Sequence, residues 1–267
     1  MDLPLFEGIT SDLFPKVEIP TPDFKNLFSC IDTVMEAEKL QKEPYFMKKI
    51  IELYQMILVR HGLMVVGDTY ASKSTIIRVL ALALGLMEER GFGEQKVKYE
   101  IINPKSLTNP QLYGITDLAT GEWTDGVLPV KFKNLANDPS TDRKWMWFDG
   151  PVDAIWIEDM NTVLDDNKKL CLANGDIFYM SDTMNLIFEP RNLLVASPAT
   201  VSRCGMVFME PYMIGWMHLY KTWKAHLPEH FDEKTLEDMD IYIQTVLVPL
   251  LAIFDKGEFE QTAPCMP

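Results

Sequence analysis

The chain has 267 residues, of which 47% are hydrophobic and 24% charged, and its net charge of −14 results from 25 basic and 39 acidic residues. This composition is typical of globular domains and excludes disordered, collagen-like and coiled-coil chains. An acidic chain without a run of Lys or Arg is also a poor partner for nucleic acid or an anionic membrane surface. We therefore expect one large α/β domain, alone or with a small second one.

The beginning of the sequence and its cysteines indicate the cellular compartment. Residues 1–4 lack both the basic and the apolar region of a secretory signal. The longest apolar runs, 80–87 and 246–254, are much shorter than the roughly 20 residues of a membrane-spanning helix. The four cysteines are far apart and form no C-x-x-C pair, which argues against a disulfide scaffold or a zinc site. We expect a reduced, soluble, intracellular protein.

The first 60 residues predict a lead-in followed by two helices. Residues 1–25 are rich in Pro and acidic groups and predict an extended segment on the surface. A weak amphipathic helix is expected over 23–37, with Asp23 as its N-cap. A stronger helix starts at Pro44, has apolar residues at three- and four-residue spacing, and ends at Gly62.

From residue 63 onward, short apolar runs alternate with helical patterns. The runs predict buried strands at 63–66, 97–102, 145–148, 186–188, 193–196 and 206–209. Helices are expected over 75–89 and 152–163. Turn residues predict hairpins within 109–126 and around Asn174-Gly175, and the pattern is helical from Tyr212 onward. Strands that alternate with helices predict a mostly parallel sheet.

A phosphate-binding motif follows the first predicted strand. Residues 67–74 have the frame G-x-x-x-x-G-K-[ST], with Ser72 in place of the second glycine. In such a loop, backbone N–H groups and the helix N-terminus hold a polyphosphate, while Lys73 reaches the outer phosphates and the Ser74 hydroxyl binds magnesium. Ala71 and Ser72 add side-chain atoms where backbone must approach phosphate. The alternative is a Ser-Lys-Ser sequence that only caps a helix.

A second motif ends the strand predicted at 145–148. Asp149 follows this apolar run, as in a Walker B element, where the aspartate holds magnesium through water. A hydrolysing site of this type has a glutamate next to the aspartate to activate water, but this chain has Gly150 there. Asp153 and Glu158 are nearby but would point elsewhere from a regular helix. The site is predicted to bind nucleotide and to hydrolyse it poorly, although Asp149 could instead belong to a helix N-terminus.

Two long blocks, residues 148–168 and 196–206, resemble the dynein heavy chains. They are most similar to the second of the six AAA+ modules of the motor ring in axonemal forms. Shorter matching blocks lie at 5–15, 59–62, 111–114 and 122–128, so the resemblance covers nearly the whole chain. It implies a P-loop NTPase fold of the AAA+ type, which is a three-layer α/β sandwich with a parallel sheet, followed by the start of a helical lid.

The resemblance also implies three parts and a nucleotide site. The parts are a lead-in with a first helix (1–42), a large α/β subdomain (43–211) and a partial helical lid (212–267). ATP or ADP with magnesium would contact Gly67, Ser72, Lys73, Ser74 and Asp149, with Ser74 and Asp149 at the metal. Modules of this kind usually have glycines in place of Ala71 and Ser72, so nucleotide binding itself stays an open question.

Two further residues receive roles from the resemblance. Ser197 follows the strand predicted at 193–196 and takes the place of the polar sensor of the γ-phosphate, whereas Asn192 precedes that strand. Arg203 matches the arginine finger, which in this ring points into the first module, the main hydrolysing site. The alternative for Arg203 is an ordinary ion pair with an acidic residue. The region 111–126 would be an insert hairpin that faces the linker arm.

The function implied is a nucleotide-binding, largely non-hydrolysing module that contributes Arg203 to a neighbouring ATPase site in a microtubule motor. Its partners would be neighbouring AAA+ modules and the linker and, through the parent complex, intermediate chains, light chains and microtubules. The location would be the cytoplasm, the cytoskeleton and the axoneme of the cilium. Two alternatives stay open. One is a stand-alone P-loop ATPase that uses Asp153 or Glu158 as base, and the other is a truncated dynein-like interaction module without nucleotide.

Overall fold

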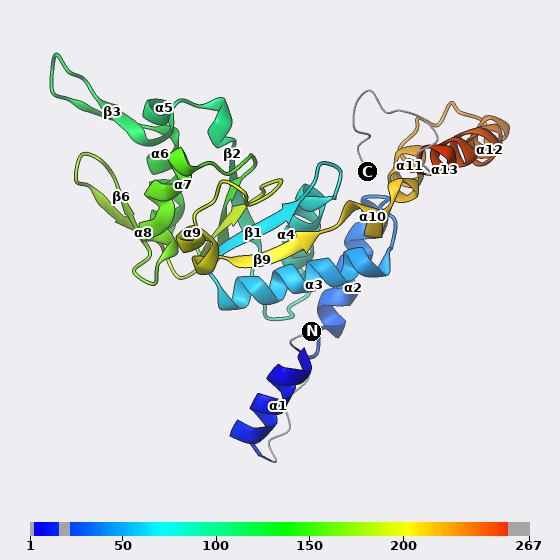
Figure 1. Ribbon diagram of the computed structural model, residues 1–267, viewed down its shortest axis with the longest axis horizontal. Helices are drawn as coiled ribbons and strands as arrows, with labels where there is room; N and C mark the ends of the chain where they lie inside the picture. Colours follow the sequence, from blue (N-terminus) through cyan, green and yellow to red (C-terminus); the bar gives the residue numbers. More distant parts are fainter. Residues whose placement is uncertain (1–2, 16–21, 256–267) are drawn as a thin grey trace.

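A five-stranded parallel sheet forms the centre of the molecule in a computed structural model, which describes residues 3–15 and 22–255 (Figure 1). The strand order is β2-β5-β8-β1-β9, and every neighbouring pair is parallel. The strands are β1 (Gly62–Gly67), β2 (Val97–Ile102), β5 (Arg143–Phe148), β8 (Met184–Phe188) and β9 (Gly205–Met209). The predicted mostly parallel α/β sheet is confirmed, because strands covered on both faces have continuous apolar sequences.

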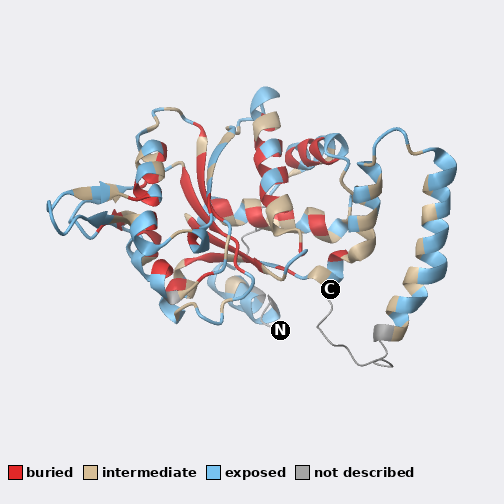
Figure 2. Ribbon diagram, turned by 90° about the horizontal axis from the view of Figure 1, so that it is seen from above, coloured by how far each residue is buried: buried red, intermediate tan, exposed pale blue. Residues whose placement is uncertain are grey.

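Helices cover both faces of the sheet and complete three layers. Alternate residues of β1 point to opposite faces, so Leu63 and Val65 belong to one hydrophobic cluster, and Met64 and Val66 belong to the other. The first cluster includes residues of α2 (Lys25–Ala37), α3 (Pro44–Val59) and α4 (Lys73–Glu89). The second includes residues of α6 (Val127–Asn137), α7 (Ala154–Ile157) and α8 (Asn161–Leu164). Figure 2 shows the buried residues concentrated in the sheet and these helices.

Two antiparallel hairpins project from one end of the molecule, away from the C-terminal helices (Figure 1). After α5 (Asn109–Tyr113), β3 (Gly114–Thr116) pairs with β4 (Trp123–Asp125), and β6 (Lys169–Cys171) pairs with β7 (Ile177–Tyr179). Both hairpins were predicted from turn residues and are confirmed. Gly114 has φ +123° and lies against the Trp123 ring, so a side chain would not fit there.

Helices occupy the end of the described chain, as the aromatic helical pattern predicts. They are α10 (Pro211–Ile214), α11 (Trp216–Ala225), α12 (Glu233–Tyr242), a π-helical turn η3 (Ile243–Leu247) and α13 (Val248–Asp255). Figure 2 shows that α12 and α13 stand apart from the sheet and are mostly exposed. In the described part of the chain, every helix is too short or too polar to cross a bilayer. The division at residues 42 and 211 stays a prediction.

Side-chain contacts define the ends of α2 and α3. Phe24, and not Asp23, is the N-cap of α2, while the Asp23 carboxylate accepts a hydrogen bond from the Lys25 N–H at 2.9 Å. Pro44 is in the first turn of α3, as predicted. Gly62 does not end α3 but begins β1, where a Cβ atom would collide with the Leu164 side chain.

Three predicted segments are wrong. The lead-in is not extended throughout, because α1 (Leu3–Leu13) is helical and Pro4 is compatible with a first helical turn. Residues 16–21 of that lead-in lie outside the described residues. The helix predicted over 152–163 is interrupted by a 3₁₀ turn, η2 (Glu158–Met160). The strand predicted at 193–196 is a loop, because the Asn192 side chain accepts a hydrogen bond from the Leu194 N–H at 3.2 Å and turns the chain.

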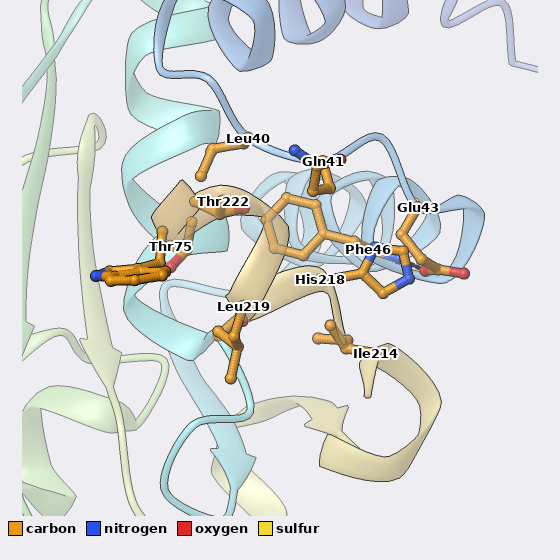
Figure 3. Close-up of a pocket in the computed structure, with 11 residues that line it drawn as sticks. Leu40, Gln41, Glu43, Phe46, Thr75, Ile214, His218, Leu219 and Thr222 are labelled. Carbon is orange, nitrogen blue, oxygen red and sulfur yellow. Dashed lines mark hydrogen bonds between the residues drawn. The ribbon is translucent and has the colours of Figure 1, made fainter. Parts of the chain in front are cut away.

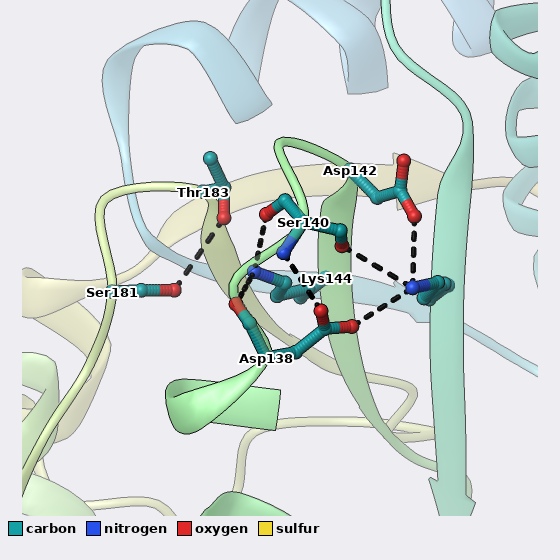
Figure 4. Close-up of polar contacts among 7 residues, drawn as sticks. Asp138, Ser140, Asp142, Lys144, Ser181 and Thr183 are labelled. Atoms are coloured by element: carbon teal, nitrogen blue, oxygen red, sulfur yellow. Dashed lines mark hydrogen bonds and ion pairs between the residues drawn. The ribbon is translucent and has the colours of Figure 1, made fainter. Parts of the chain in front are cut away.

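A polar cluster anchors the first residues of β5 (Figure 4). Lys144 is 1% exposed, and its ammonium donates to the carbonyl oxygens of Asp138 and Ser140 at 2.7 and 2.9 Å. Beside it, Lys98 of β2 pairs with Asp138 and Asp142, both at 2.9 Å. These contacts fix the loop before β5 and therefore the register of the strand that ends at Asp149.

Candidate nucleotide site

The loop between β1 and α4 contains the phosphate-binding motif. Gly67 ends β1 so close to the Met209 carbonyl that a Cβ atom would collide with it. Tyr70 and Ser72 both have left-handed backbone conformations, with φ +65° and +59°. Such angles are strained for non-glycine residues and usually belong to glycine. The loop therefore keeps a glycine-type shape although its sequence has lost the second glycine.

The Lys73 side chain lies across this loop. Its ammonium donates hydrogen bonds to the carbonyl oxygens of Gly67 and Asp68, at 2.7 and 2.9 Å. Burial lowers the pKa of Lys73, and the negative charges of Glu189 and Asp149 partly oppose this effect. The amine is thus placed at the mouth of the loop, where an incoming phosphate could replace the two carbonyl oxygens.

Asp149 and Gly150 follow the end of β5 on the same edge of the sheet. The Asp149 N–H donates to the Ile102 carbonyl at 2.9 Å, which continues the pairing of β5 with β2. The Asp149 side chain is exposed. A Cβ atom at Gly150 would lie 3.0 Å from the Asn103 side-chain oxygen, so little room remains for a larger residue.

These elements surround a cavity of about 580 Å³. Its lining comprises Thr69, Tyr70, Ala71, Ser72, Lys73, Ser74, Thr75, Arg78, Asp149, Gly150, Pro151, Glu189, Arg191 and Leu219. The structure therefore brings Ser72, Lys73, Ser74 and Asp149 to one place, with Gly67 at the base of the loop. The lining carries basic groups and carboxylates together, which suits a phosphate with a divalent cation.

Asp153 and Glu158 are not among the described residues that line this cavity. The Asp153 carboxylate caps α7, accepting hydrogen bonds from the N–H groups of Ile155 and Trp156 at 2.9 and 3.2 Å. It also forms an ion pair with Lys105, which lowers its pKa. Asp153 is therefore fully engaged in local structure.

Glu189 is a site residue that the sequence reasoning missed. It follows the last residue of β8, is 8% exposed, and lines the cavity. Its carboxylate accepts hydrogen bonds from the Ser74 hydroxyl at 2.6 Å and the Trp147 indole N–H at 3.0 Å. Burial raises its pKa, an effect that the Ser74 hydrogen bond opposes. Its place after the apolar run 186–188 was the available signal, because functional groups collect at the carboxyl ends of parallel strands.

The prediction of Ser197 as the polar sensor rested on a strand that does not exist. Ser197 is the N-cap of α9 (Pro198–Arg203), and its hydroxyl accepts from the Thr200 N–H at 3.2 Å. It is not among the described residues that line the cavity. The strand next to β1 ends at Phe188, so the residue at the expected sensor position is Glu189.

An apolar pocket of about 260 Å³ adjoins the phosphate cavity (Figure 3). The two cavities share Ser72, Thr75 and Leu219. The remaining wall comes from the segment before α3, from α3 and from the helices after β9: Leu40, Gln41, Glu43, Phe46, Ile214, His218, Thr222 and Trp223. The His218 Nδ1 atom is buried and lacks a hydrogen-bond partner within the described residues. A flat apolar group attached to a phosphate chain would fit this arrangement.

Arg203 lies at the opposite end of the parallel strands, near their amino ends. It ends α9, two residues before β9 begins beside Leu63, whereas the phosphate loop follows Gly67 beside Met209. From Leu63 to Gly67 a strand rises about 3.3 Å per residue, or roughly 13 Å in total. The Arg203 side chain is 31% exposed, pairs with Asp165 and donates to the Ala199 carbonyl at 2.7 Å. It is therefore too distant to act on the cavity of its own chain.

Comparisons with known proteins agree with the fold. Residues 1–74 match the family model described as "Hydrolytic ATP binding site of dynein motor region". The chain is 48% identical to dynein axonemal heavy chain 12 of Mus musculus over 256 residues, which cover 96% of this chain and 8% of that protein. It is 50% identical to dynein axonemal heavy chain 3 of Homo sapiens over 251 residues, covering 94% of this chain and 6% of the relative.

A third relative extends the similarity within the same group. Dynein axonemal heavy chain 6 of Homo sapiens is 47% identical over 239 residues, covering 88% of this chain and 6% of that protein. The chain thus spans 8% or less of the length of these three relatives. The parallel sheet with its phosphate loop is consistent with an AAA+ P-loop domain. The chain is therefore homologous, over nearly its whole length, to one segment of the axonemal dynein heavy chains.

Proposed function

We propose that this chain is the second AAA+ module of an axonemal dynein heavy chain, and that it binds ATP or ADP with magnesium without turning it over. The observation that carries the proposal is the shared cavity, where Lys73, Ser74 and Asp149 meet while Gly150 occupies the position of a catalytic glutamate. The homology to axonemal heavy chains supports the same assignment.

Each residue of the cavity has a role that follows from its chemistry. The Lys73 ammonium, which donates to two loop carbonyls, would bind the outer phosphate oxygens in their place, and the N-terminus of α4 would stabilise the negative charge. The Ser74 hydroxyl and the Asp149 carboxylate are oxygen donors of the kind that magnesium prefers, and magnesium neutralises phosphate charge when bound. Arg78 and Arg191 add positive charge to the lining. The base would fit the adjoining apolar pocket, whose lining includes Phe46 and Leu219.

The arrangement of carboxylates favours binding over hydrolysis. A water-activating base must have a free oxygen close to the attacking water. Gly150 has no side chain, and Asp153 is committed to its cap and to Lys105. Glu189 points into the cavity, but both of its oxygens accept hydrogen bonds from the protein. These contacts weigh against the stand-alone ATPase.

Arg203 is proposed to act outside this chain, as the arginine finger of the neighbouring module. Its partial exposure and its position at the far edge of the sheet support this role. The hairpin of β3 and β4, within residues 111–126, is proposed to face the linker arm. Intermediate chains, light chains and microtubules would be partners of the assembled motor, and the axoneme of the cilium would be its location.

A titration with Mg·ATP, combined with a phosphate-release assay, tests this proposal on the full chain. We expect micromolar or tighter binding without release, and Lys73→Ala should weaken binding about 10- to 150-fold, since it removes a hydrogen bond to a charged group. Lys131→Ala is a matched control, because Lys131 pairs with Glu100 and is not among the lining residues. Release that disappears in Lys73→Ala would favour the ATPase, and an unmodified chain that does not bind would favour the interaction module.

A further inference from the structure

The buried carboxylate of Glu189 has a geometry that points to a specific task. Glu189 joins three elements of the site, because it follows β8, contacts Ser74 at the start of α4, and accepts from Trp147 of β5. We infer that Glu189 is the positioning residue of the magnesium site, and that it orients the Ser74 hydroxyl so that its lone pairs face the cation. This inference rests on the proposed nucleotide binding.

The chemistry of the hydroxyl group supports this role. A serine hydroxyl has one proton to donate and two lone pairs to offer. The 2.6 Å separation between the Ser74 and Glu189 oxygens is typical of a charge-assisted O–H···O⁻ bond, in which the proton points to the carboxylate. The lone pairs of Ser74 are then free for a hard cation such as magnesium. A hydroxyl that can rotate would instead have to be ordered when the metal binds.

Trp147 fixes the carboxylate that orients Ser74. The indole N–H can only donate, and it holds one Glu189 oxygen at 3.0 Å while the other oxygen faces Ser74. Trp147 itself is 2% exposed and lies two residues before Asp149 on β5. The strand β5 therefore contributes to the site in two ways. It leads to Asp149, which lines the cavity, and its Trp147 holds the Glu189 carboxylate that orients Ser74.

The charges and hydrogen bonds around the Glu189 carboxylate favour a bound cation. A buried carboxylate is stable only when positive charge or hydrogen bonds compensate it. Two neutral donors and the half-buried ammonium of Lys73 provide this compensation in the described site. A divalent cation held by Ser74 would add the positive charge that such a carboxylate lacks. Groups that orient metal ligands in this way typically change metal affinity 10- to 100-fold when mutated.

The test measures the gain in ATP affinity that magnesium provides, as the ratio of the dissociation constants in EDTA and in excess Mg²⁺. In Glu189→Gln, we expect this ratio to fall about 10-fold. Trp147→Phe should lower the ratio in the same direction and to a smaller extent. Binding of Mn²⁺ to the ATP complex, followed by electron paramagnetic resonance, should weaken in parallel.

Controls separate this role from others. Glu100→Gln removes a partly exposed carboxylate that pairs with Lys131 and is not among the described residues that line the cavity, so it should leave the ratio unchanged. Equal losses in EDTA and Mg²⁺, or an unchanged ratio in Glu189→Gln, would overturn the inference. So would a phosphate release that Glu189→Gln abolishes at an unchanged ratio, since that result would make Glu189 a base. If the unmodified chain binds no nucleotide in either condition, the proposed function fails, and this inference fails with it.

Discussion

The two ends of β1 present polar groups in opposite ways. At the carboxyl end, Lys73, Ser74 and Glu189 bond to the loop or to each other and converge on one cavity. At the other end, Arg203 pairs with one carboxylate among the described residues, Asp165, and about a third of its side chain is in contact with solvent. The carboxyl end of β1 can hold a ligand within the chain, whereas the amino end presents the Arg203 guanidinium at the surface.

On the proposed function, this difference would allow a module that does not hydrolyse nucleotide to act in a neighbouring site. Hydrolysis depends on a correctly placed base at the carboxyl edge, where Gly150 now stands. A contribution to a neighbouring site depends on the opposite edge alone. The contacts of Arg203 are with Ala199 of α9 and with Asp165, and not with the phosphate loop, so we expect a change in that loop to leave Arg203 in place.

The largest expected effect concerns Arg203. In a full-length heavy chain that contains this segment, Arg203→Ala should slow ATP hydrolysis about 10³-fold or more, because an arginine finger stabilises charge in the transition state of phosphoryl transfer. The measurement is microtubule-stimulated ATPase activity of the motor. Nucleotide binding to this module should be unchanged, because Arg203 is not among the described residues that line its cavity.

Asp165→Asn sharpens this comparison. It removes the partner of Arg203 and keeps the arginine itself. If Arg203 acts in the neighbouring module, hydrolysis should stay within about threefold of the unmodified motor, since the guanidinium itself remains and a partly exposed ion pair contributes little. Equal losses in Arg203→Ala and Asp165→Asn would instead mean that the ion pair is a structural contact of this chain, and that the two edges do not differ in function.

A smaller effect is expected in the phosphate loop. Ser72 has φ +59°, so Ser72→Gly should relieve strain and raise the free energy of unfolding by up to about 1 kcal/mol. Ala71→Gly is the matched control. Ala71 is fully buried and is absent from the described residues with positive φ, so glycine there should lower stability by about 1 kcal/mol. Thermal unfolding of the full chain measures both, and a loss of stability in Ser72→Gly would show that the loop is not strained.

The sequence predicted most accurately the elements that local residue patterns define. The run at 63–66 was found within one residue of β1, since a strand inside a parallel sheet has an unbroken apolar sequence. Residues 97–102 form β2 as predicted, but as an edge strand and not as a buried one, since Lys98 and Glu100 interrupt its apolar residues and only Ile102 is buried. The phosphate loop was found because its spacing is fixed by backbone geometry. Turn residues such as Asn174-Gly175 located the hairpins for the same local reason.

Other features depend on contacts between distant residues. Glu189 becomes a site residue only because the fold brings Ser74, 115 positions away, and Trp147, 42 positions away, to its carboxylate. The apolar run 193–196 looked like a strand, but a single Asn192 side chain turns the backbone, and Leu194 is 91% exposed. The apolar pattern of residues 193–196 does not reveal this turn, because the same short run can belong to an Asx turn or to a buried strand.

The smallest expected effect concerns His61, which directly precedes β1 and so lies at the end of the strand opposite the phosphate loop. Its Nε2 atom is 3.0 Å from the Val163 carbonyl oxygen, and burial lowers its pKa, an effect that the Val163 hydrogen bond opposes. A histidine with a lowered pKa in the folded state binds fewer protons there than in the unfolded chain. Its contribution to stability is therefore present above the unfolded value of about 6.5 and is lost as the pH falls toward the folded value.

We expect the melting temperature to fall between pH 7.5 and pH 5.5, and to fall less in His61→Gln, which carries no titrating ring at this position. His230→Gln is the control, because it removes an exposed histidine from the helical end of the chain. Its response to pH should equal that of the unmodified chain. Since His61 is remote from the cavity, Mg·ATP should bind to His61→Gln with unchanged affinity at pH 7.5. Weaker binding in that variant would show that the two edges of β1 are coupled, contrary to the independence argued from their separate contacts.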